Sequence, residues 1–262
     1  MYPTLLKFGS FEITTFGLMM FLAFIIGGWV LARQFRRHGL DEELASSIVV
    51  AAALGGIVGA KVYYAILFRD WHLLFDRAGL VWYGGLIGGL LACSWLLWRR
   101  RIDFLTVADA SAPALAIGYA LGRIGCFLVG DDYGRPTDAW FGVAFPKGAP
   151  PTTASSLRDF GVAVDPSIPG YQVLKVHPTQ LYESSAALVM FLILMSLNRR
   201  PHPRGRAFGL FLVMLGIERF LVEIVRAKDD RFFGGFTVAQ LISVLIAIAG
   251  VVLIARREAK TA

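Results

Sequence analysis

Seven apolar stretches occupy most of the chain, at residues 15–32, 44–68, 80–98, 104–129, 181–197, 207–225 and 236–255. Each approaches or exceeds the roughly 20 residues that an α-helix needs to cross about 30 Å of hydrocarbon. Backbone groups inside a bilayer must find hydrogen-bond partners within the protein, and a helix provides them within each stretch. The sequence therefore predicts an all-α membrane protein with seven transmembrane helices.

The composition supports a membrane protein and argues against a nucleic-acid partner. Hydrophobic residues make up 56% of the 262 residues, which is typical of a polytopic membrane protein. The net charge of +7 would suit nucleic acid, but the arginines cluster between apolar stretches and form no continuous basic stripe. The two cysteines, Cys93 and Cys126, both lie within apolar stretches, so we expect no disulfide framework.

Basic clusters at alternate ends of the apolar stretches predict the orientation. They are Arg33, Arg36 and Arg37; Arg99, Arg100 and Arg101; Arg199, Arg200, Arg204 and Arg206; and Arg256, Arg257 and Lys260. The lysines and arginines of the other connecting segments are spread over much longer sequence. Because dense basic clusters stay on the cytoplasmic side, we expect the N-terminus outside and the C-terminus in the cytoplasm.

The segment 130–176 is the longest stretch without an apolar run, and this orientation makes it extracytoplasmic. Its many prolines are typical of an irregular loop, with one short helix predicted near residues 153–159. The sequence contains no internal repeat. We therefore expect one integral membrane domain over residues 1–262, with the loop 130–176 inserted between the fourth and fifth spans.

Arg123 lies near the end of the fourth apolar stretch, where an ionisable side chain costs roughly 2.5–3.5 kcal/mol and marks a functional-site hypothesis. A glycine-spaced polar turn follows it and includes Asp131 and Gly134. The planar guanidinium can bind two oxygens of a phosphate. The alternative is a structural arginine paired with a buried carboxylate. Cys126 lies one helical turn from Arg123 and shares its face.

A second polar group begins the fifth apolar stretch. The run HPTQLYES contains His177, Gln180, Tyr182 and Glu183, and its proline and threonine are typical of a helix start. Helix capping and hydrogen bonding between helices could explain the threonine and the glutamine. Glu183 is different, because a buried acid needs a partner.

The sixth stretch carries Arg219, Glu223 and Arg226 on one helix face. Glu223 could hold one arginine in place and leave the other charge for a ligand, or the three could form a structural ion-pair ladder. Arg123 and Arg226 both lie near the outer ends of their stretches. An anionic phospholipid headgroup would suit such a pocket, with its acyl chains in the surrounding lipid.

Glycines recur at short spacing in the second and third stretches, and they predict close packing of two helices. The alternative is that the glycines beside Tyr83 let a ligand approach the backbone, although tyrosine and tryptophan are also common at the membrane interface. The chain has no zinc-ligand spacing, no nucleotide-binding glycine loop and no serine-hydrolase elbow. We expect no metal and no cofactor.

Five blocks in order resemble the prolipoprotein diacylglyceryl transferases: TFGLM, WYGGLIGG, GRIGCFLVGDDYGRPTD, HPTQLYES and ERFLVEIVR. The third block is similar to the family stretch GRIGNFxNGExxGRxT. The resemblance covers nearly the whole chain. It implies a multi-pass enzyme of the bacterial inner membrane that moves a diacylglyceryl group from phosphatidylglycerol to the lipobox cysteine of a prolipoprotein signal peptide, releasing glycerol 1-phosphate.

The resemblance also implies roles for individual residues. Arg123 and Arg219 would bind the lipid phosphate, and Glu223 would orient Arg219. Asp131 stands where the family usually has glutamate, and Gly134 matches an essential glycine. Gln180, Tyr182 and Glu183 would line the site. Arg226 and His177 are also expected at the substrate site, on the pattern of the residues and not on the resemblance.

Three departures from the family pattern matter. Phe16, Tyr83 and Cys126 stand where a tyrosine, a histidine and an asparagine are usual. The proton of the acceptor thiol could pass to Tyr83, Asp131 or His177. The departures leave two alternatives open, a phospholipid-using transferase with a different acceptor and a lipid-binding relative without catalytic activity.

Overall fold

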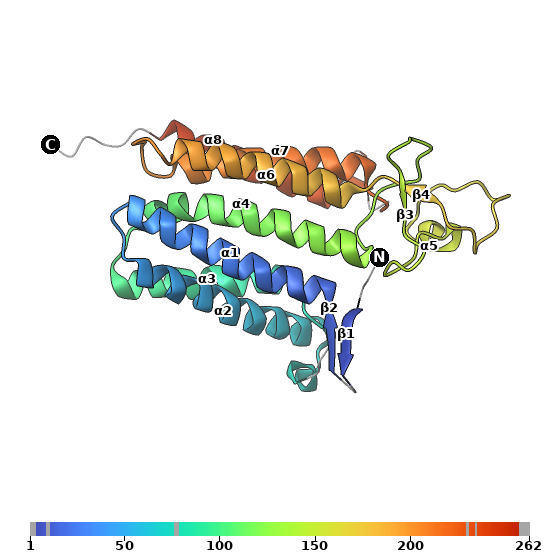
Figure 1. Cartoon of the computed structure of the whole chain (residues 1–262), viewed down its shortest axis with the longest axis horizontal. Helices are drawn as coiled ribbons and strands as arrows, with labels where there is room; N and C mark the ends of the chain where they lie inside the picture. Colours follow the sequence, from blue (N-terminus) through green and yellow to red (C-terminus); the bar gives the residue numbers. More distant parts are fainter. Residues whose placement is uncertain (1–3, 9–10, 76–78, 229–230, 234, 257–262) are drawn as a thin grey trace. The chain divides into compact units, whose positions relative to one another are not determined.

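The computed structural model describes residues 4–8, 11–75, 79–228, 231–233 and 235–256. Long helices dominate this part of the chain (Figure 1). They are α1 (Thr15–Arg37), α2 (Glu42–Phe68), α3 (Trp82–Arg100), α4 (Phe104–Val129), α6 (Thr179–Leu197), α7 (Arg206–Val225) and α8 (Val238–Ala255). Their ends differ from the predicted apolar stretches by only a few residues. Arg257 and Lys260, from the last of the basic clusters used to predict orientation, lie outside the described residues, as does Arg77 of the segment between α2 and α3.

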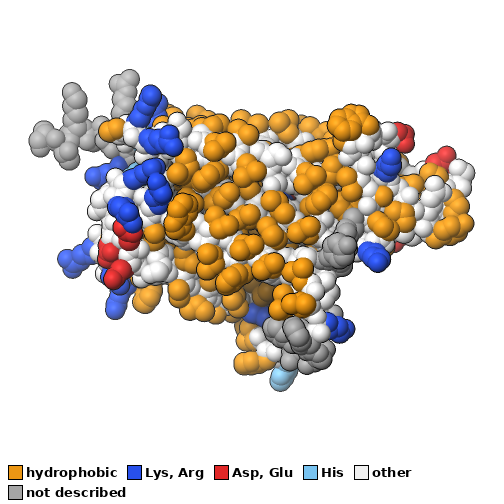
Figure 2. Space-filling model, viewed as in Figure 1, with side chains coloured by type: hydrophobic (Ala, Val, Ile, Leu, Met, Phe, Trp, Pro, Cys, Tyr) orange, Lys and Arg blue, Asp and Glu red, His pale blue; other side chains and the backbone are white. Residues whose placement is uncertain are grey.

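Five of the described helices, α1, α2, α4, α6 and α8, are long and apolar enough to cross a membrane. On the face shown in Figure 2, hydrophobic side chains cover the long helices. Soluble monomers rarely expose such continuous apolar surface. The chain is therefore a membrane protein. Helices α3 and α7 are outside this set of five, and α7 carries Glu218, Arg219 and Glu223 within its apolar sequence.

The chain forms two compact units, Gly28–Ser111 and the remainder, Met1–Gly27 with Ala112–Ala262. In the first, α2 packs closely against α3. A Cβ atom at Gly59 would lie 2.7 Å from Cα of Gly88, and one at Gly55 would lie 2.7 Å from the carbonyl oxygen of Gly88. The predicted glycine-mediated packing is confirmed, because the two backbones approach too closely for larger residues.

In the other unit, α6 packs on α7 and α7 packs on α8 (Figure 1). The contact between α7 and α8 also depends on small residues, since a Cβ atom at Gly216 would meet the carbonyl oxygen of Ser243. A buried apolar cluster joins Ala116 of α4, Leu194 of α6 and Phe211 of α7. Three of these helices, α4, α6 and α7, hold charged residues of the site described below.

The segment 130–176 has a small core of its own. Strands β3 (Val143–Ala144) and β4 (Lys175–Val176) pair antiparallel, and α5 (Ala154–Asp159) begins at a Thr153 side-chain cap. The short helix predicted here is confirmed. The core of the segment consists of Tyr133, Phe145, Leu157, Val162 and Val176, and Ala227, which follows α7, packs with them. Apart from this helix, the sequence predicted an irregular loop and missed the two strands, because strands of two residues leave no pattern that can be recognised.

Two further sheets were not predicted. Strand β1 (Thr4–Phe8) pairs with β2 (Phe11–Thr14) before α1, and β5 (Arg231–Phe233) pairs with β6 (Phe236–Thr237) before α8. A 3₁₀ turn, η1 (Trp71–Leu74), follows α2. These elements connect the long helices and leave the predominantly helical architecture unchanged.

We expect Gly59→Ala to destabilise the α2–α3 pair by about 1–3 kcal/mol, because its Cβ would press on the α3 backbone. Gly56→Ala is the matched control, since its Cβ would lie 3.6 Å from the carbonyl oxygen of Gly85, an ordinary contact. Thermal unfolding in detergent measures both. Equal stability of the two variants would contradict close packing at Gly59.

Candidate functional site

A tight turn after α4 joins the start of α6 to the end of α7. The Gly134 amide donates to the carbonyl of His177, and the Arg135 amide donates to the carbonyl of Val225. A Cβ atom at Gly134 would lie 2.7 Å from both His177 Cβ and the Val225 carbonyl oxygen. Only glycine fits at this position, so Gly134 is what allows three elements to meet.

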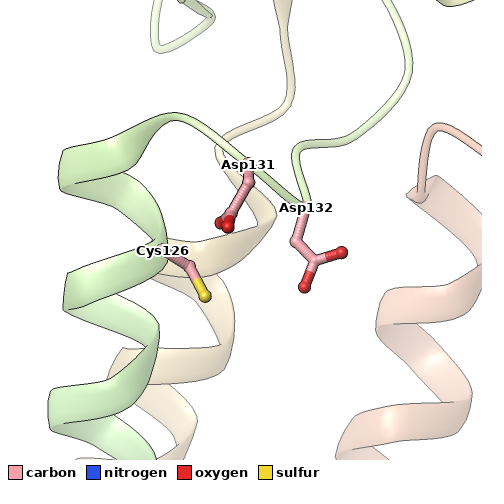
Figure 3. A group of neighbouring side chains, drawn as sticks. All are labelled: Cys126, Asp131 and Asp132. Atoms are coloured by element: carbon pink, nitrogen blue, oxygen red, sulfur yellow. The ribbon is translucent and has the colours of Figure 1, made fainter. Parts of the chain in front are cut away.

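Two side chains at the start of α6 hold the backbone of this turn. Thr179 Oγ1 donates to the carbonyl of Asp132 at 2.7 Å, and Gln180 Nε2 donates to the carbonyl of Asp131 at 2.5 Å. Asp132 has a left-handed conformation, with φ of 53°. Aspartate tolerates this region better than most residues. These two hydrogen bonds fix the backbone of the turn, and the side chains of Asp131 and Asp132 point in different directions from it (Figure 3).

Three arginines and three carboxylates form a closed ring of ion pairs, which we call the ion-pair ring. Its members are Arg123 of α4, Asp132 of the turn, Glu183 of α6, Arg219 and Glu223 of α7, and Arg226, which follows α7. In order around the ring, the N–O distances are 2.7 Å for Arg123–Glu183, 3.3 Å for Glu183–Arg219, 2.6 Å for Arg219–Glu223, 3.6 Å for Glu223–Arg226, 2.5 Å for Arg226–Asp132 and 3.0 Å for Asp132–Arg123. Every member contacts two members of opposite charge.

The members of the ring differ sharply in exposure. The side chains of Glu183 and Glu223 are 1% exposed, whereas that of Asp132 is 40% exposed. The arginine side chains lie between these extremes, at 17% to 22%. Two buried acids thus fix the three guanidinium groups from inside the protein. An isolated buried carboxylate would be very costly, so these two acids need their arginines.

The ring is not fully aligned for hydrogen bonding. Oε2 of Glu183 and Oε2 of Glu223 are close to arginine nitrogens, yet neither has a hydrogen-bond partner among the described residues. Arg123 also stacks on the ring of Tyr119, with its guanidinium carbon 5.4 Å from the ring centre. The Tyr119 hydroxyl donates to Glu218 at 3.3 Å. A part-buried hydroxyl–acid pair, Tyr119 with Glu218, therefore lies beside the ion-pair ring.

Asp131 and Asp132 are adjacent in sequence but have opposite electrostatic environments. Burial raises the pKa of Asp131. Burial alone would also raise the pKa of Asp132, but Arg226 and Arg123 outweigh it and hold that pKa below the ordinary value. Asp132 is therefore the anion of the turn, and Asp131 is the better proton acceptor near neutral pH.

Cys126, Asp131 and Asp132 come close enough together for their ligand atoms to lie within 4.8 Å of one another (Figure 3). Such a set can hold a metal ion in principle. Here the carboxylate of Asp132 already bridges Arg123 and Arg226, so a cation would have to compete with two fixed guanidinium groups. This donor set does not favour a metal, and the cluster belongs to the anion-binding side of the site.

Three of the other predicted site residues, His177, Tyr182 and Phe16, belong to the same unit as the ion-pair ring. His177 Nδ1 lies 3.2 Å from the Tyr182 hydroxyl, and both rings contact Phe141 in the loop. Phe16 of α1 packs against α4, since a Cβ atom at Gly125 would lie 3.2 Å from its ring. Tyr83 lies on α3, in the unit Gly28–Ser111, and meets Trp82 edge-on.

Asp132 and Tyr119 were not predicted from the sequence as site residues. Tyr119 precedes Arg123 by four residues, so helical spacing alone could have placed it on the same face. Asp132 gave no such signal, because it stands beside the acid that the family pattern specifies. Its role depends on the left-handed turn, which the sequence did not predict.

Comparison with known proteins now identifies the family. The model of the family described as prolipoprotein diacylglyceryl transferase matches residues 3–256. The chain belongs to the prolipoprotein diacylglyceryl transferase family. Among its relatives is a phosphatidylglycerol–prolipoprotein diacylglyceryl transferase of Geobacter sulfurreducens, 32% identical over 273 residues that cover 98% of this chain and 96% of the relative.

Two other family members show the same extent of similarity. The phosphatidylglycerol–prolipoprotein diacylglyceryl transferase of Vibrio atlanticus is 31% identical, with 96% of this chain and 89% of the relative covered. The enzyme of the same name from Sodalis glossinidius is 32% identical, with 97% and 92% covered. The resemblance recognised from five sequence blocks is thus confirmed over nearly the whole chain.

The ion-pair ring predicts a large difference between its buried and exposed acids. Glu183→Gln should lower the free energy of unfolding by about 3 kcal/mol or more, because it leaves a buried cationic pair undercompensated. Asp132→Asn should cost about 1 kcal/mol or less, since its side chain is partly in water. Thermal unfolding in detergent tests this order, and a larger loss in the Asp132 variant would contradict it.

Proposed function

We propose that this family member transfers a diacylglyceryl group from phosphatidylglycerol to the thiol of a prolipoprotein lipobox cysteine. The observation that carries the proposal is the ion-pair ring, which presents Arg123 and Arg226 to a single exposed anion at the ends of α4 and α7. Guanidinium groups held in this way suit a phosphate oxygen. The names of the relatives supply the donor and the acceptor class.

The proposed topology has seven transmembrane helices in the bacterial inner membrane, with the N-terminus outside and the C-terminus cytoplasmic. Arginines follow this pattern in the last turns of α1 and α3, at Arg36, Arg37, Arg99 and Arg100. Helix α7 can cross as well, because Arg219 and Glu223 neutralise each other within the ring. On this topology the loop 130–176 and the ion-pair ring lie at the outer side of the membrane. The whole chain then acts as one integral membrane domain.

In the proposed reaction, the acceptor sulfur attacks the glyceryl carbon that carries the phosphate oxygen. A carbon–sulfur bond forms, the carbon–oxygen bond breaks, and the electron pair leaves with glycerol 1-phosphate. Arg123 and Arg226, which face the exposed anion, and Arg219, which shares Glu183 with Arg123, together stabilise the charge that develops on the leaving phosphate. Glu183 contacts both arginines and Glu223 contacts Arg219, so these acids hold the guanidinium groups before substrate arrives.

The thiol proton needs a base, and Asp131 is the group that we favour. Its pKa is raised by burial, and its carboxylate lies beside Cys126 in the turn (Figure 3). A raised pKa makes a carboxylate a better proton acceptor near neutral pH. His177 and Tyr83 are the alternative bases. The substrate site would also be lined by Cys126, Gln180, Tyr182 and Phe16.

The departures at Phe16, Tyr83 and Cys126 favour one alternative, a phospholipid-using transferase with another acceptor. Complementation of a strain that lacks prolipoprotein lipidation distinguishes the proposed prolipoprotein acceptor from another acceptor. Growth would support the proposed acceptor. Failure despite normal membrane expression, together with release of glycerol 1-phosphate in the presence of other thiols, would support the alternative.

Arg123→Ala and Arg219→Ala should each reduce transfer of labelled lipid to a lipobox peptide by about 10²–10³-fold, because each removes charge stabilisation from the leaving phosphate. The assay measures lipid-modified peptide and released glycerol 1-phosphate together. Lys147→Ala is the control, since Lys147 is an exposed cation of the loop 130–176 and lies outside the ion-pair ring. Full activity of both arginine variants would overturn the proposal.

The pH dependence tests Asp131 as the base. A base acts in its deprotonated form, so kcat/KM should rise with pH through the pKa of Asp131, which lies above that of an ordinary aspartate. Asp131→Asn should remove this rise and lower the rate by about 10²–10⁴-fold. If His177→Gln removed the rise and Asp131→Asn did not, the base would be His177.

A further inference from the structure

Only one carboxylate of the ion-pair ring can leave without stranding a buried charge. The side chains of Glu183 and Glu223 are 1% exposed, so rotation of either would separate charges inside the protein. Asp132 is 40% exposed and can turn its carboxylate into water. The ring is therefore fixed on its inner side and can open on its outer side.

The contacts of Asp132 are those expected of a bound phosphate. Its Oδ2 accepts from Arg123 at 3.0 Å, and its Oδ1 accepts from Arg226 at 2.5 Å. Two oxygens of one anion thus bridge two guanidinium groups. The two non-bridging oxygens of a phosphodiester can form the same bridge.

The turn allows the side chain to move while its backbone stays in place. Thr179 and Gln180 hold the carbonyls of Asp132 and Asp131, so the polypeptide path is fixed at both residues. Hydrogen bonds of the Asp132 carboxylate are found only with Arg123 and Arg226 in the described part of the chain. Rotation about its side-chain bonds is then sufficient to free both arginines.

Charge balance favours the same exchange. The ring has three positive and three negative groups, so loss of Asp132 from it leaves one net positive charge. A phosphodiester headgroup carries one negative charge and would restore neutrality. A phosphate monoester, like other monoesters with a second pKa near 6, carries about −1.5 to −2 at neutral pH and would exceed it.

We propose that Asp132 is an exchangeable internal anion: it holds Arg123 and Arg226 in the empty enzyme, gives way to the phosphate of the lipid donor, and returns as the phosphate product leaves. This inference rests on the proposed function. The family stretch quoted above specifies residues at Asp131 and Gly134 but leaves the position of Asp132 open, so the exchange belongs to this chain.

The test compares phosphatidylglycerol binding by the wild-type chain and Asp132→Asn in nanodiscs of phosphatidylcholine. An exposed ion pair of ordinary strength would leave the Asp132 carboxylate on Arg123 and Arg226 for roughly four-fifths of the time. Removing this carboxylate should therefore tighten phosphatidylglycerol binding about fivefold. Inhibition by glycerol 1-phosphate should strengthen by at least as much. Asp132→Ser repeats the test if the Asn variant fails to fold.

Two controls separate exchange from a general charge effect. Asp132→Glu keeps the anion and should bind within about twofold of wild type, since the competing carboxylate is still present. Asp138→Asn removes an exposed charge of the loop 130–176 and should change neither phosphatidylglycerol binding nor inhibition by glycerol 1-phosphate. Equal tightening in Asp138→Asn would overturn the inference.

The outcomes also separate this inference from the proposed function. If the wild-type chain transfers lipid and Asp132→Asn binds phosphatidylglycerol no more tightly than wild type, the exchange is wrong and the transferase proposal stands. If the wild-type chain neither binds phosphatidylglycerol in preference to phosphatidylcholine nor transfers it, both are wrong.

Discussion

Burial of Glu183 and Glu223 is the constraint on which the rest of this site depends. Two carboxylates at 1% exposure must be neutralised. Glu223 is paired with Arg219 and Arg226, which lie close to it in the chain, whereas the arginines that neutralise Glu183 come from two other helices. Glu183 on α6 contacts Arg123 on α4 and Arg219 on α7, so one acid ties three helices together. The positions of the guanidinium groups are therefore set by the protein before any substrate binds.

The turn after α4 completes this arrangement. Gly134 lets it approach α6 and α7, and Thr179 and Gln180 fix the backbone at Asp131 and Asp132. The left-handed conformation of Asp132 then separates two neighbouring acids, with one in the ion-pair ring and one beside Cys126. In this short glycine-dependent turn, Asp132 therefore pairs with two arginines while Asp131 is partly buried beside Cys126.

The sequence predicted the helices because the length of an apolar run is a strong and local signal. It also predicted Arg123, Arg219 and Glu183, since an ionisable group in such a run needs a reason to be there. It could not predict how these charges pair, because Arg123 and Glu183 lie 60 positions apart and their contact depends on how three helices pack.

Asp132 shows most clearly what the sequence leaves out. Asp131 and Asp132 are adjacent and chemically identical, so only the backbone angles of the turn distinguish their roles. The short strands of the loop were missed for a related reason, since two-residue pairings depend on partners far away in sequence. Local patterns predicted the helices and the charged residues, whereas tertiary contacts decide how those charged residues pair.

The most direct test of the phosphate site is an experimental structure of the chain in nanodiscs that contain phosphatidylglycerol. Our account predicts lipid phosphate oxygens within about 3 Å of the guanidinium groups of Arg123 and Arg226, with the Asp132 carboxylate turned away from both. It also predicts that Glu183 and Glu223 keep their arginine contacts. A lipid phosphate bound elsewhere, with all six members of the ion-pair ring still paired as described, would contradict it.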